Sequence, residues 1–188
     1  FEYLNSNAES AGLSWSEVSS YPSVPKMAMA VDGDDDSGSY DVQLQKGQSK
    51  EGPIRLAGKR VTISAKVNPD VKSPNGVIAA IGGQVAGVTL FVKDNQVYGG
   101  VRSNGEFKWV SKPTPLGDFE AELNLNSSGL SLSVDGGSAA RRSDVKLFET
   151  SSKDGIDVGR DSGQLVGDYP TDFNFEGEID DTRILIRE

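Results

Sequence analysis

The chain of 188 residues contains neither cysteine nor histidine. Without cysteine there is no disulfide framework and no thiolate metal site. Without histidine the commonest general base is missing, and so are the Ser-His-Asp and Cys-His arrangements and nearly every zinc site. Most of the familiar catalytic arrangements are therefore excluded, and we expect a protein that is not an enzyme, with no catalytic residues.

Basic residues are also scarce, with 19 Lys and Arg against 28 Asp and Glu, a net charge of -9. This balance disfavours nucleic acid and anionic membranes as partners, because phosphate binding needs clustered cations. The negative charge also disfavours strongly sulfated glycans as ligands, unless a bound cation or a local basic patch compensates for it. No apolar run approaches the roughly 20 residues of a membrane span, so we expect no membrane insertion. No signal peptide is visible, and we expect Phe1 to begin a mature or excised chain.

Long apolar repeats with helical period are missing as well, while the chain contains 22 glycines and many Ser, Asn and Asp residues. This composition is typical of many short strands joined by tight turns. The length suits one domain with a substantial core. We predict a single all-β domain over residues 1–188, in which residues 1–25 form an extended, Ser-rich lead-in with one short strand at 12–18.

Alternating apolar and polar residues locate most of the strands. Residues 61–67 alternate, and residues 119–125 and 130–134 do the same on either side of a turn, which predicts a hairpin with one buried face. Residues 26–42 indicate a strand, an acidic turn and a second strand. Residues 156–158 indicate a short strand.

Residues 76–111 predict a meander of four strands. Asp94-Asn95 and Asn104-Gly105 suit two-residue turns, in which both central positions need a positive φ. With such turns Phe91 pairs with Tyr98, and both Thr89 and Trp109 pair with Gly100. Five side chains then share one face, opposite a face of valines and leucines: Phe91, Tyr98, Arg102, Phe107 and Trp109.

The last strand, residues 172–188, changes parity near its middle. Its apolar residues keep one parity up to Ile179 and the other from Thr182 onward. A slip of one residue turns every later side chain to the opposite face unless a bulge absorbs it. We therefore predict a β-bulge that turns Asp180 and Asp181 outward.

Two segments carry a family resemblance. The first is Met29-Ala-Val-Asp-Gly-Asp-Asp-Asp followed by Tyr40-Asp-Val42, with extra residues at 37–39. The second is Phe175-x-Gly-x-Ile-Asp-Asp-Thr-Arg-Ile184, with Thr182 where an aliphatic residue is usual. They resemble the opening and closing strands of concanavalin A-like, laminin G-like domains. The resemblance implies a jelly-roll β-sandwich of two antiparallel sheets, whose first and last strands lie close together.

A narrower resemblance rests on Gly-rich motifs spread from about residue 27 to residue 186. They are Gly76-Val-Ile, Gly82-Gly83, Gly87-Val-Thr-Leu-Phe-Val-Lys-Asp94, Asp157-Val-Gly-Arg-Asp-Ser-Gly163, Asp168-Tyr169 and Phe173-x-Phe-x-Gly-x-Ile179. These motifs resemble the β-sandwich domain found C-terminal to many bacterial arylsulfatases. The sulfatase signature Cys-x-Pro-x-Arg is excluded by the lack of cysteine, so the resemblance implies an accessory domain rather than a catalytic one.

Acidic residues gather in the turn at 32–36 and at the predicted bulge. Calcium prefers several oxygen ligands on a flexible loop, and the resemblance implies that these two segments meet. A structural calcium is therefore expected on Asp32, Asp34, Asp36, Asp180 and Asp181.

The turn is not an EF-hand, because Ser37 replaces the turn glycine and Gln43 stands where the bidentate Glu belongs. The alternative is that these residues are solvated turn acids, since Asp favours turns through its own hydrogen bonds.

The aromatic face of the 96–110 hairpin is the candidate sugar-binding surface. An aromatic ring packs on the apolar face of a pyranose, and an arginine donates hydrogen bonds in a fixed fork. Gly99 and Gly100 would leave room beneath Trp109. The alternative is that this face points inward and the aromatics belong to the core. The predicted ligand-binding residues are Tyr98, Arg102, Asn104, Phe107 and Trp109.

Glu178, Ile179 and Asp180 are similar to the Glu-x-Asp-x-x-Glu strand of retaining glucanases with this fold, in which carboxylates flank the scissile bond at about 5 Å. Here Arg183 takes the position of the last acid, and the predicted bulge would break the alternation. Catalysis by this strand is therefore disfavoured.

The function predicted from the sequence is non-catalytic, lectin-like binding of a polysaccharide or oligosaccharide. We expect an accessory domain of a secreted bacterial protein, extracellular or in the cell envelope, with a catalytic domain of the same parent as a further partner. One alternative is a structural packing domain that supports a sulfatase-like enzyme and binds no glycan. A polysaccharide hydrolase or lyase is the less favoured third alternative.

Overall fold

The computed structural model describes residues 31–32 and 38–188, with the backbone alone at 31–32. The expected strand at 12–18 lies outside these residues. The described residues form strands and no α-helix. In chain order the strands are β1 (Val31–Asp32), β2 (Tyr40–Leu44), β3 (Ser49–Lys50), β4 (Arg60–Pro69), β5 (Gly76–Gly82), β6 (Ala86–Lys93), β7 (Gln96–Ser103), β8 (Glu106–Pro113), β9 (Phe119–Asn126), β10 (Gly129–Val134), β11 (Ala140–Arg142), β12 (Ile156–Val158) and β13 (Gly177–Arg187).

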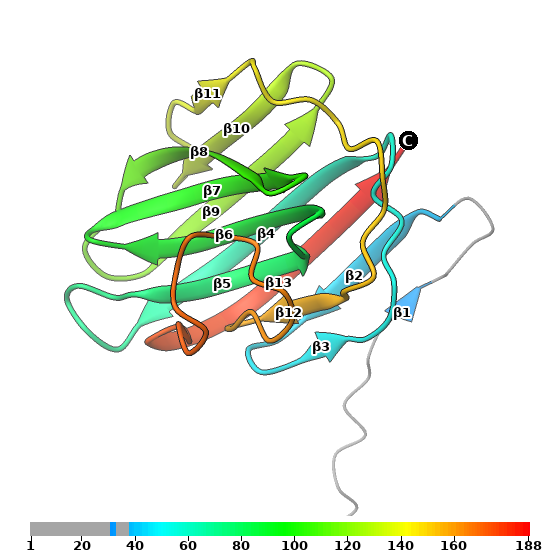
Figure 1. The fold of residues 1–188 in the computed structure, drawn as a ribbon. Coiled ribbons are helices and arrows are strands. Elements are labelled where there is room, and N and C mark those ends of the chain that lie inside the picture. Colours follow the sequence, from blue (N-terminus) through cyan, green and yellow to red (C-terminus); the bar gives the residue numbers. More distant parts are fainter. Residues whose placement is uncertain (1–30, 33–37) are drawn as a thin grey trace, which may run out of the picture.

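The strands form two sheets packed face to face (Figure 1). One sheet has seven strands in the order β1-β2-β13-β4-β9-β10-β11, and the other has six in the order β3-β12-β5-β6-β7-β8. Every ladder between these strands is antiparallel. This confirms the predicted all-β jelly-roll sandwich. The last strand, β13, pairs with β2 along residues 40–44 and 182–186. β1 lies on the other side of β2, so β1 does not meet β13 directly as the resemblance implies.

The main core lies between the sheets and is filled by the inward residues of each alternating strand. On β4 and β9 every second side chain is buried, and the rest face water. This is the pattern expected where one face of an antiparallel sheet is solvated. The largest fully buried side chains are Leu44, Ile54, Leu56, Ile63, Ile78, Ile81, Leu90, Leu123, Leu125, Leu130, Leu132 and Ile156.

The predicted meander is confirmed strand by strand. Asp94, Asn95, Asn104 and Gly105 all have positive φ, as two-residue turns require. The resulting register pairs Phe91 with Tyr98, as predicted. It also pairs Gly100 with both Thr89 and Trp109. The valines and leucines of the opposite face are all buried in the main core.

The predicted bulge in the last strand is also present. The register of β13 against β4 shifts between Ile179 and Asp181, so one residue is inserted there. Ile179 and Thr182 are consequently both buried although their parity differs. Asp180 is exposed and Asp181 half-buried, which confirms that the bulge turns both carboxylates away from the core.

Three features differ from the sequence prediction. The strand begins at Gly177 rather than at residue 172, since Phe173 and Phe175 belong to the loop that precedes it. Short strands β3 and β11 form in segments where the sequence predicted no strand. They lack a long alternating pattern because each has only two or three residues.

The part of the chain that the structure describes contains no helix with the length and apolar composition of a membrane span.

Candidate functional site

One row of paired residues crosses the whole outer face of the six-stranded sheet. Residues that pair directly across an antiparallel ladder point to the same face. The registers therefore define a continuous row, one residue from each strand: Ser49, Asp157, Ala80, Thr89, Gly100 and Trp109. Five strand spacings separate Ser49 from Trp109, which is about 24 Å.

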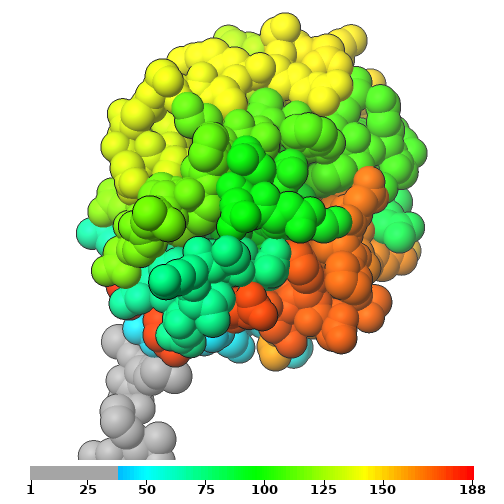
Figure 2. Space-filling model, turned by 90° about the vertical axis from the view of Figure 1, so that its left-hand side faces the viewer, coloured from blue at the N-terminus to red at the C-terminus, as the bar shows by residue number. Residues whose placement is uncertain are grey.

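The loop between β12 and β13, residues 159–176, covers the middle of this row. It passes in front of β5 and β6 (Figure 1), and its orange atoms adjoin the green atoms of the sheet in Figure 2. The loop contributes two buried side chains, Val166 and Tyr169, to a second apolar cluster with Val77, Ala80 and Phe91. β5 and β6 are therefore buried on both faces.

Buried hydrogen bonds hold the loop in place. The Tyr169 hydroxyl donates to Asp161 Oδ2 at 2.7 Å, and the same oxygen accepts the Val166 N–H at 2.8 Å. The hydroxyls of Tyr169 and Thr89 are 3.0 Å apart, which joins the loop to the sheet. Asp161 is only 7% exposed, and this burial raises the pKa of its carboxyl. Burial, and then the neighbouring Asp161, raise the pKa of the Tyr169 phenol.

A row of aromatic rings extends from under the loop to open surface on β8. Tyr169 meets Phe91 edge-on at 5.1 Å, and Phe91 stacks on Tyr98 at 4.9 Å between ring centroids. Tyr98 meets Trp109 edge-on at 5.3 Å. Trp109 ends the row and is 46% exposed, whereas Tyr98 is half-buried. We call Tyr98 and Trp109 the aromatic platform.

Arg102 and Phe107 share this face, as predicted, but they are engaged by the loop. The Arg102 guanidinium donates to Gly105 O at 2.8 Å and to Val166 O, and it pairs with Asp168. Its Cζ lies 5.0 Å from the centroid of the Phe107 ring. Arg102 thus holds the loop against the sheet, and a ligand-binding role for it stays a prediction.

The two glycines of β7 do not leave space under Trp109. A side chain on Gly100 would collide with the Phe107 ring, and one on Gly99 would collide with Leu123 of the core. The expected space is filled because Phe107, rather than Trp109, lies over Gly100. Asn104 lies in the β7–β8 turn, where its N–H donates to Val85 O at 2.9 Å.

The opposite end of the row holds a polar hollow of about 340 Å³ beside β3 and β12. Asp157 and Ala80 of the row line it, together with Ser49, Arg160 and Ser162. We call it the β3–β12 pocket. Sequence reasoning proposed no ligand here, because Ser49 and Asp157 are 108 positions apart and meet only through the pairing of two very short strands. The one feature of the sequence that pointed to this pocket was the run Asp157-Val-Gly-Arg-Asp-Ser-Gly163.

The outer face of the seven-stranded sheet is hydrophilic and largely paired within itself. Two hollows of about 410 Å³ each lie on it, and no aromatic residue lines either. Thr62 Oγ1 donates to Asn124 at 2.7 Å, and Lys66 pairs with Glu120 at 3.3 Å. Such mutual pairing is typical of a solvated sheet face, which makes this side the weaker candidate for sugar stacking.

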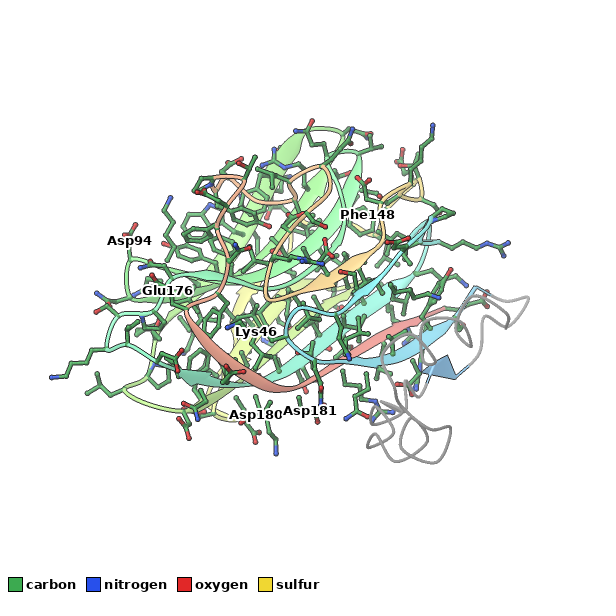
Figure 3. The ribbon with its side chains drawn as sticks, turned by 90° about the horizontal axis from the view of Figure 1, so that it is seen from below. Lys46, Asp94, Phe148, Glu176, Asp180 and Asp181 are labelled. Carbon is green, nitrogen blue, oxygen red and sulfur yellow. The ribbon has the colours of Figure 1, made fainter. Side chains whose placement is uncertain are left out.

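The predicted metal ligands are described only in part. Asp180 and Asp181 lie on the outer side of β13 (Figure 3), and Asp181 Oδ1 accepts a hydrogen bond from Gln43 Nε2 at 2.7 Å. Asp34 and Asp36 lie outside the described residues. Among the residues that are described, no three His, Cys, Asp or Glu side chains are arranged to hold a metal ion.

The register places the backbone of Asp32 away from the bulge. Asp32 pairs with Asp41, which pairs with Leu185 on the next strand. Leu185 is four residues beyond Asp181, or about 13 Å along the strand. The two described carboxylates of the set therefore do not make a calcium site by themselves, and calcium stays a prediction.

The strand similar to that of retaining glucanases lacks the required regular alternation. Glu178 and Asp180 are both exposed, but the bulge follows directly after Ile179. Arg183, at the position of the last acid, pairs with Asp41 through hydrogen bonds of 3.0 and 2.7 Å. The hydrogen bond and the charge of Arg183 lower the pKa of the Asp41 carboxyl.

The fold is shared with sugar-binding domains. No protein-family model matches this sequence, and the curated proteins contain no similar one. Among solved structures, the CBM40 domain of the Ruminococcus gnavus IT-sialidase, bound to α2,3-sialyllactose, has a TM-score of 0.54 at 15% identity over 78% of this chain and 90% of that one. The chain has the jelly-roll fold of that domain.

Two further structures agree. Domain 4 of AbnA, an extracellular arabinanase of Geobacillus stearothermophilus, in complex with arabinotriose, gives a TM-score of 0.51 at 13% identity over 79% of this chain and 82% of that one. A leech intramolecular trans-sialidase gives 0.52 at 13% identity over 78% of this chain and 25% of that one. At these identities the likeness establishes the fold, and the sulfatase association stays a prediction.

Proposed function

We propose that this domain is a non-catalytic carbohydrate-binding module that uses the aromatic platform. The observation that carries the proposal is Trp109, a large aromatic side chain left 46% exposed at the end of a supported row of rings. An exposed indole on the face of a sheet offers a flat apolar surface of the size of one sugar ring. Stacking on it would remove apolar area from water on both partners.

The platform is held in place before any ligand arrives. Tyr98 supports Trp109 from the side, and Tyr98 is in turn stacked on Phe91, which is buried. A rigid aromatic loses little conformational entropy on binding, which favours affinity. Ser111 pairs with Tyr98 on the same face and is half-buried. The two hydroxyls of Tyr98 and Ser111 are suited to bond the sugar's own hydroxyls.

The biological setting of the proposal is an accessory domain of a secreted, polysaccharide-acting protein. Of the similar domains, one is bound to sialyllactose and another to arabinotriose. A single platform of this size would bind weakly, and tethering to a catalytic domain of the same parent would raise its effective concentration at the polymer. A sulfatase-like parent and a structural calcium belong to the same proposal.

The alternative of a packing domain requires an apolar patch on one sheet. The exposed large apolar side chains in the described part are Val71, Val85, Trp109 and Leu116. Of these four, Trp109 alone lies within a strand, and the others lie in three separate connections. This distribution favours a localised binding platform over a wide buried interface.

The test is a binding titration with arabinotriose, sialyllactose and a panel of neutral and sulfated polysaccharides. Trp109→Ala should weaken binding about thirtyfold, since an aromatic hot spot is worth about 2 kcal/mol. Leu116→Ala is the matched control, because Leu116 is 91% exposed and lies outside the platform. A wild-type domain that binds no glycan would favour the packing domain. Equal binding by Trp109→Ala would refute the platform.

A further inference from the structure

The β3–β12 pocket combines hydrogen-bond acceptors and donors around a space of the size of one sugar ring. Small-ligand sites begin at about 300 Å³, and this hollow has about 340 Å³. Its floor is the end of the cross-strand row, where Ser49, Asp157 and Ala80 pair in register. The first residues of the loop after β12 form one wall.

The wall and the floor are fixed to one another by hydrogen bonds. Asp157 Oδ2 accepts from the Ser162 N–H at 2.9 Å and from its hydroxyl at 2.7 Å. Asp157 Oδ1 accepts from the Ser49 hydroxyl, and Arg160 Nη2 donates to that hydroxyl's oxygen at 3.1 Å. These bonds use both oxygens of Asp157 and one nitrogen of Arg160. Arg160 Nε also lies 3.9 Å from Asp157 Oδ1 in an ion pair. Among the described residues, the Nη1 group of Arg160 is therefore left to donate to a ligand.

Asp154 is the acceptor with spare capacity. Its backbone N–H donates to Ser152 Oγ at 3.1 Å, but within the described part of the chain its carboxylate has no hydrogen-bond or ion-pair partner. The Asp154 carboxylate occupies space that is open because residues 83 and 163 are glycines. A Cβ on Gly83 would collide with Asp154 Oδ2, and a Cβ on Gly163 would lie 3.2 Å from Asp154 Cγ. Asp154 lines the pocket. A carboxylate held in this way can accept two neighbouring hydroxyl groups at once.

The charges of the pocket nearly balance, so the lining as a whole does not strongly attract a ligand of either charge. Lys50, Lys153 and Arg160 line it together with acidic side chains in nearly equal number. A sulfate or carboxylate group that took the place of a hydroxyl at Asp154 would be repelled by that carboxylate, whereas a neutral sugar would meet donors and acceptors alike. The lining has no aromatic side chain, so recognition would proceed by hydrogen bonds rather than by stacking.

From this geometry we infer that the β3–β12 pocket is a second carbohydrate site, which takes one neutral sugar unit through a vicinal diol. Asp154 accepts the two hydroxyls, and Arg160 donates to a ring or hydroxyl oxygen. The inference rests on the proposed function in so far as the domain binds carbohydrate, but it does not require the aromatic platform. The site lies at the opposite end of the row, about 24 Å from Trp109, so the two sites would grip separate parts of a polymer.

Protein-observed NMR reads the two sites separately in one titration. The probes are methyl glycosides of galactose, glucose and arabinose, with methyl glucuronide as the charged comparison. The amide signals of Ser49, Asp154 and Ser162 report the pocket, and the Trp109 indole N–H, assigned by its absence in Trp109→Ala, reports the platform. We expect saturable pocket shifts with at least one neutral glycoside and weaker ones with the glucuronide.

The variants make the result decisive. Asp154→Ala and Arg160→Ala should each weaken pocket binding about tenfold or more, because each removes a charged hydrogen-bond partner. Asp118→Ala, which removes an exposed carboxylate from a loop that does not line the pocket, should leave it unchanged. Trp109→Ala should leave the pocket shifts intact.

The outcomes separate this inference from the proposed function. Absence of pocket shifts with every neutral glycoside overturns the second site, whatever the indole signal does. Pocket shifts that survive in both Asp154→Ala and Arg160→Ala overturn it as well. An indole signal that never moves, beside a pocket that saturates, overturns the platform while supporting the pocket.

Discussion

Thr89 and Tyr169, 80 positions apart in the chain, meet through their hydroxyl groups at 3.0 Å in the middle of the six-stranded sheet. Thr89 belongs to the cross-strand row and Tyr169 to the loop that covers it. Their contact closes a buried network, since Tyr169 also donates to Asp161. The loop that this network holds separates the aromatic platform from the β3–β12 pocket, so the contact maintains both candidate surfaces.

Tyr169→Phe should destabilise the domain by about 2 kcal/mol. The change keeps the ring and its packing on Phe91 but removes the hydroxyl that bonds Thr89 and Asp161. A hydrogen bond to a charged group is worth about 1.5–3 kcal/mol, and the buried Asp161 carboxylate would lose one of its donors. Urea unfolding followed by tryptophan fluorescence measures the change in the free energy of unfolding.

Tyr98→Phe is the control for this experiment. Tyr98 belongs to the same aromatic row, but its hydroxyl has no partner among the described residues, so the free energy of unfolding should change by less than about 0.5 kcal/mol. Equal losses in the two variants would show that the Tyr169 hydroxyl contributes nothing specific to the loop.

Asp161 should make the domain less stable as the pH rises through mildly acidic values. Burial raises the pKa of this carboxyl in the folded state above its ordinary value of about 3.9. The folded state therefore binds the proton more tightly than the unfolded state does. Its contribution to stability is fully present below about pH 4 and is lost as the pH rises through the raised pKa.

Asp161→Asn isolates this contribution, because the amide oxygen can still accept from Tyr169 and Val166 but does not titrate. The free energy of unfolding of the wild type minus that of the variant should fall as the pH rises from about 4. Taking the difference removes the contribution of Asp41, whose lowered pKa gives the opposite slope at lower pH. A difference that rises with pH would mean that hydrogen bonding to the carboxylate outweighs its burial.

Much of the fold could be predicted because local rules decide it. The turns at Asp94-Asn95 and Asn104-Gly105 need residues that tolerate positive φ, and those residues fix the register of three strands. The change of parity around Asp180 predicted the bulge for a similar reason, since a buried face cannot tolerate a slip. The same alternation placed Trp109 on one face with Tyr98, opposite the valines and leucines, but it did not decide which of the two faces meets water.

The loop could not be predicted in this way because long-range contacts decide its path. Nothing local tells that Val166 and Tyr169 will pack on Val77 and Phe91, which lie in other strands. The sequence left two alternatives, an exposed aromatic face or a core. The structure combines them, because the loop buries Phe91 but stops before Trp109.

Thr182→Val should stabilise the domain by about 1 kcal/mol. Thr182 follows the bulge and is fully buried, and its Oγ1 has no hydrogen-bond partner in the described structure. A buried hydroxyl without a partner costs about 1–3 kcal/mol, and valine has nearly the same shape. The midpoint of thermal unfolding should rise by about 2–4 °C.

Thr62→Val is the matched control for that substitution. Thr62 lies on the neighbouring strand β4, and its hydroxyl donates to Asn124 at 2.7 Å, so the same change should be neutral or destabilising there. If both variants gain stability equally, the gain comes from strand propensity rather than from the unpaired hydroxyl of Thr182.

Removal of calcium tests the remaining prediction from the sequence. If the turn at 32–36 and the bulge bind calcium together, calcium at 100 times its dissociation constant should stabilise the wild type by about 2.7 kcal/mol, and EDTA should reverse the effect. The double substitution Asp180→Ala and Asp181→Ala should abolish the response, because the bulge then offers no carboxylate.

The control is Asp70→Ala with Asp118→Ala, which removes the same charge from two exposed positions outside the set and should preserve the response to calcium. A response of equal size in both double variants, or none in the wild type, would leave the acidic residues as solvated turn acids.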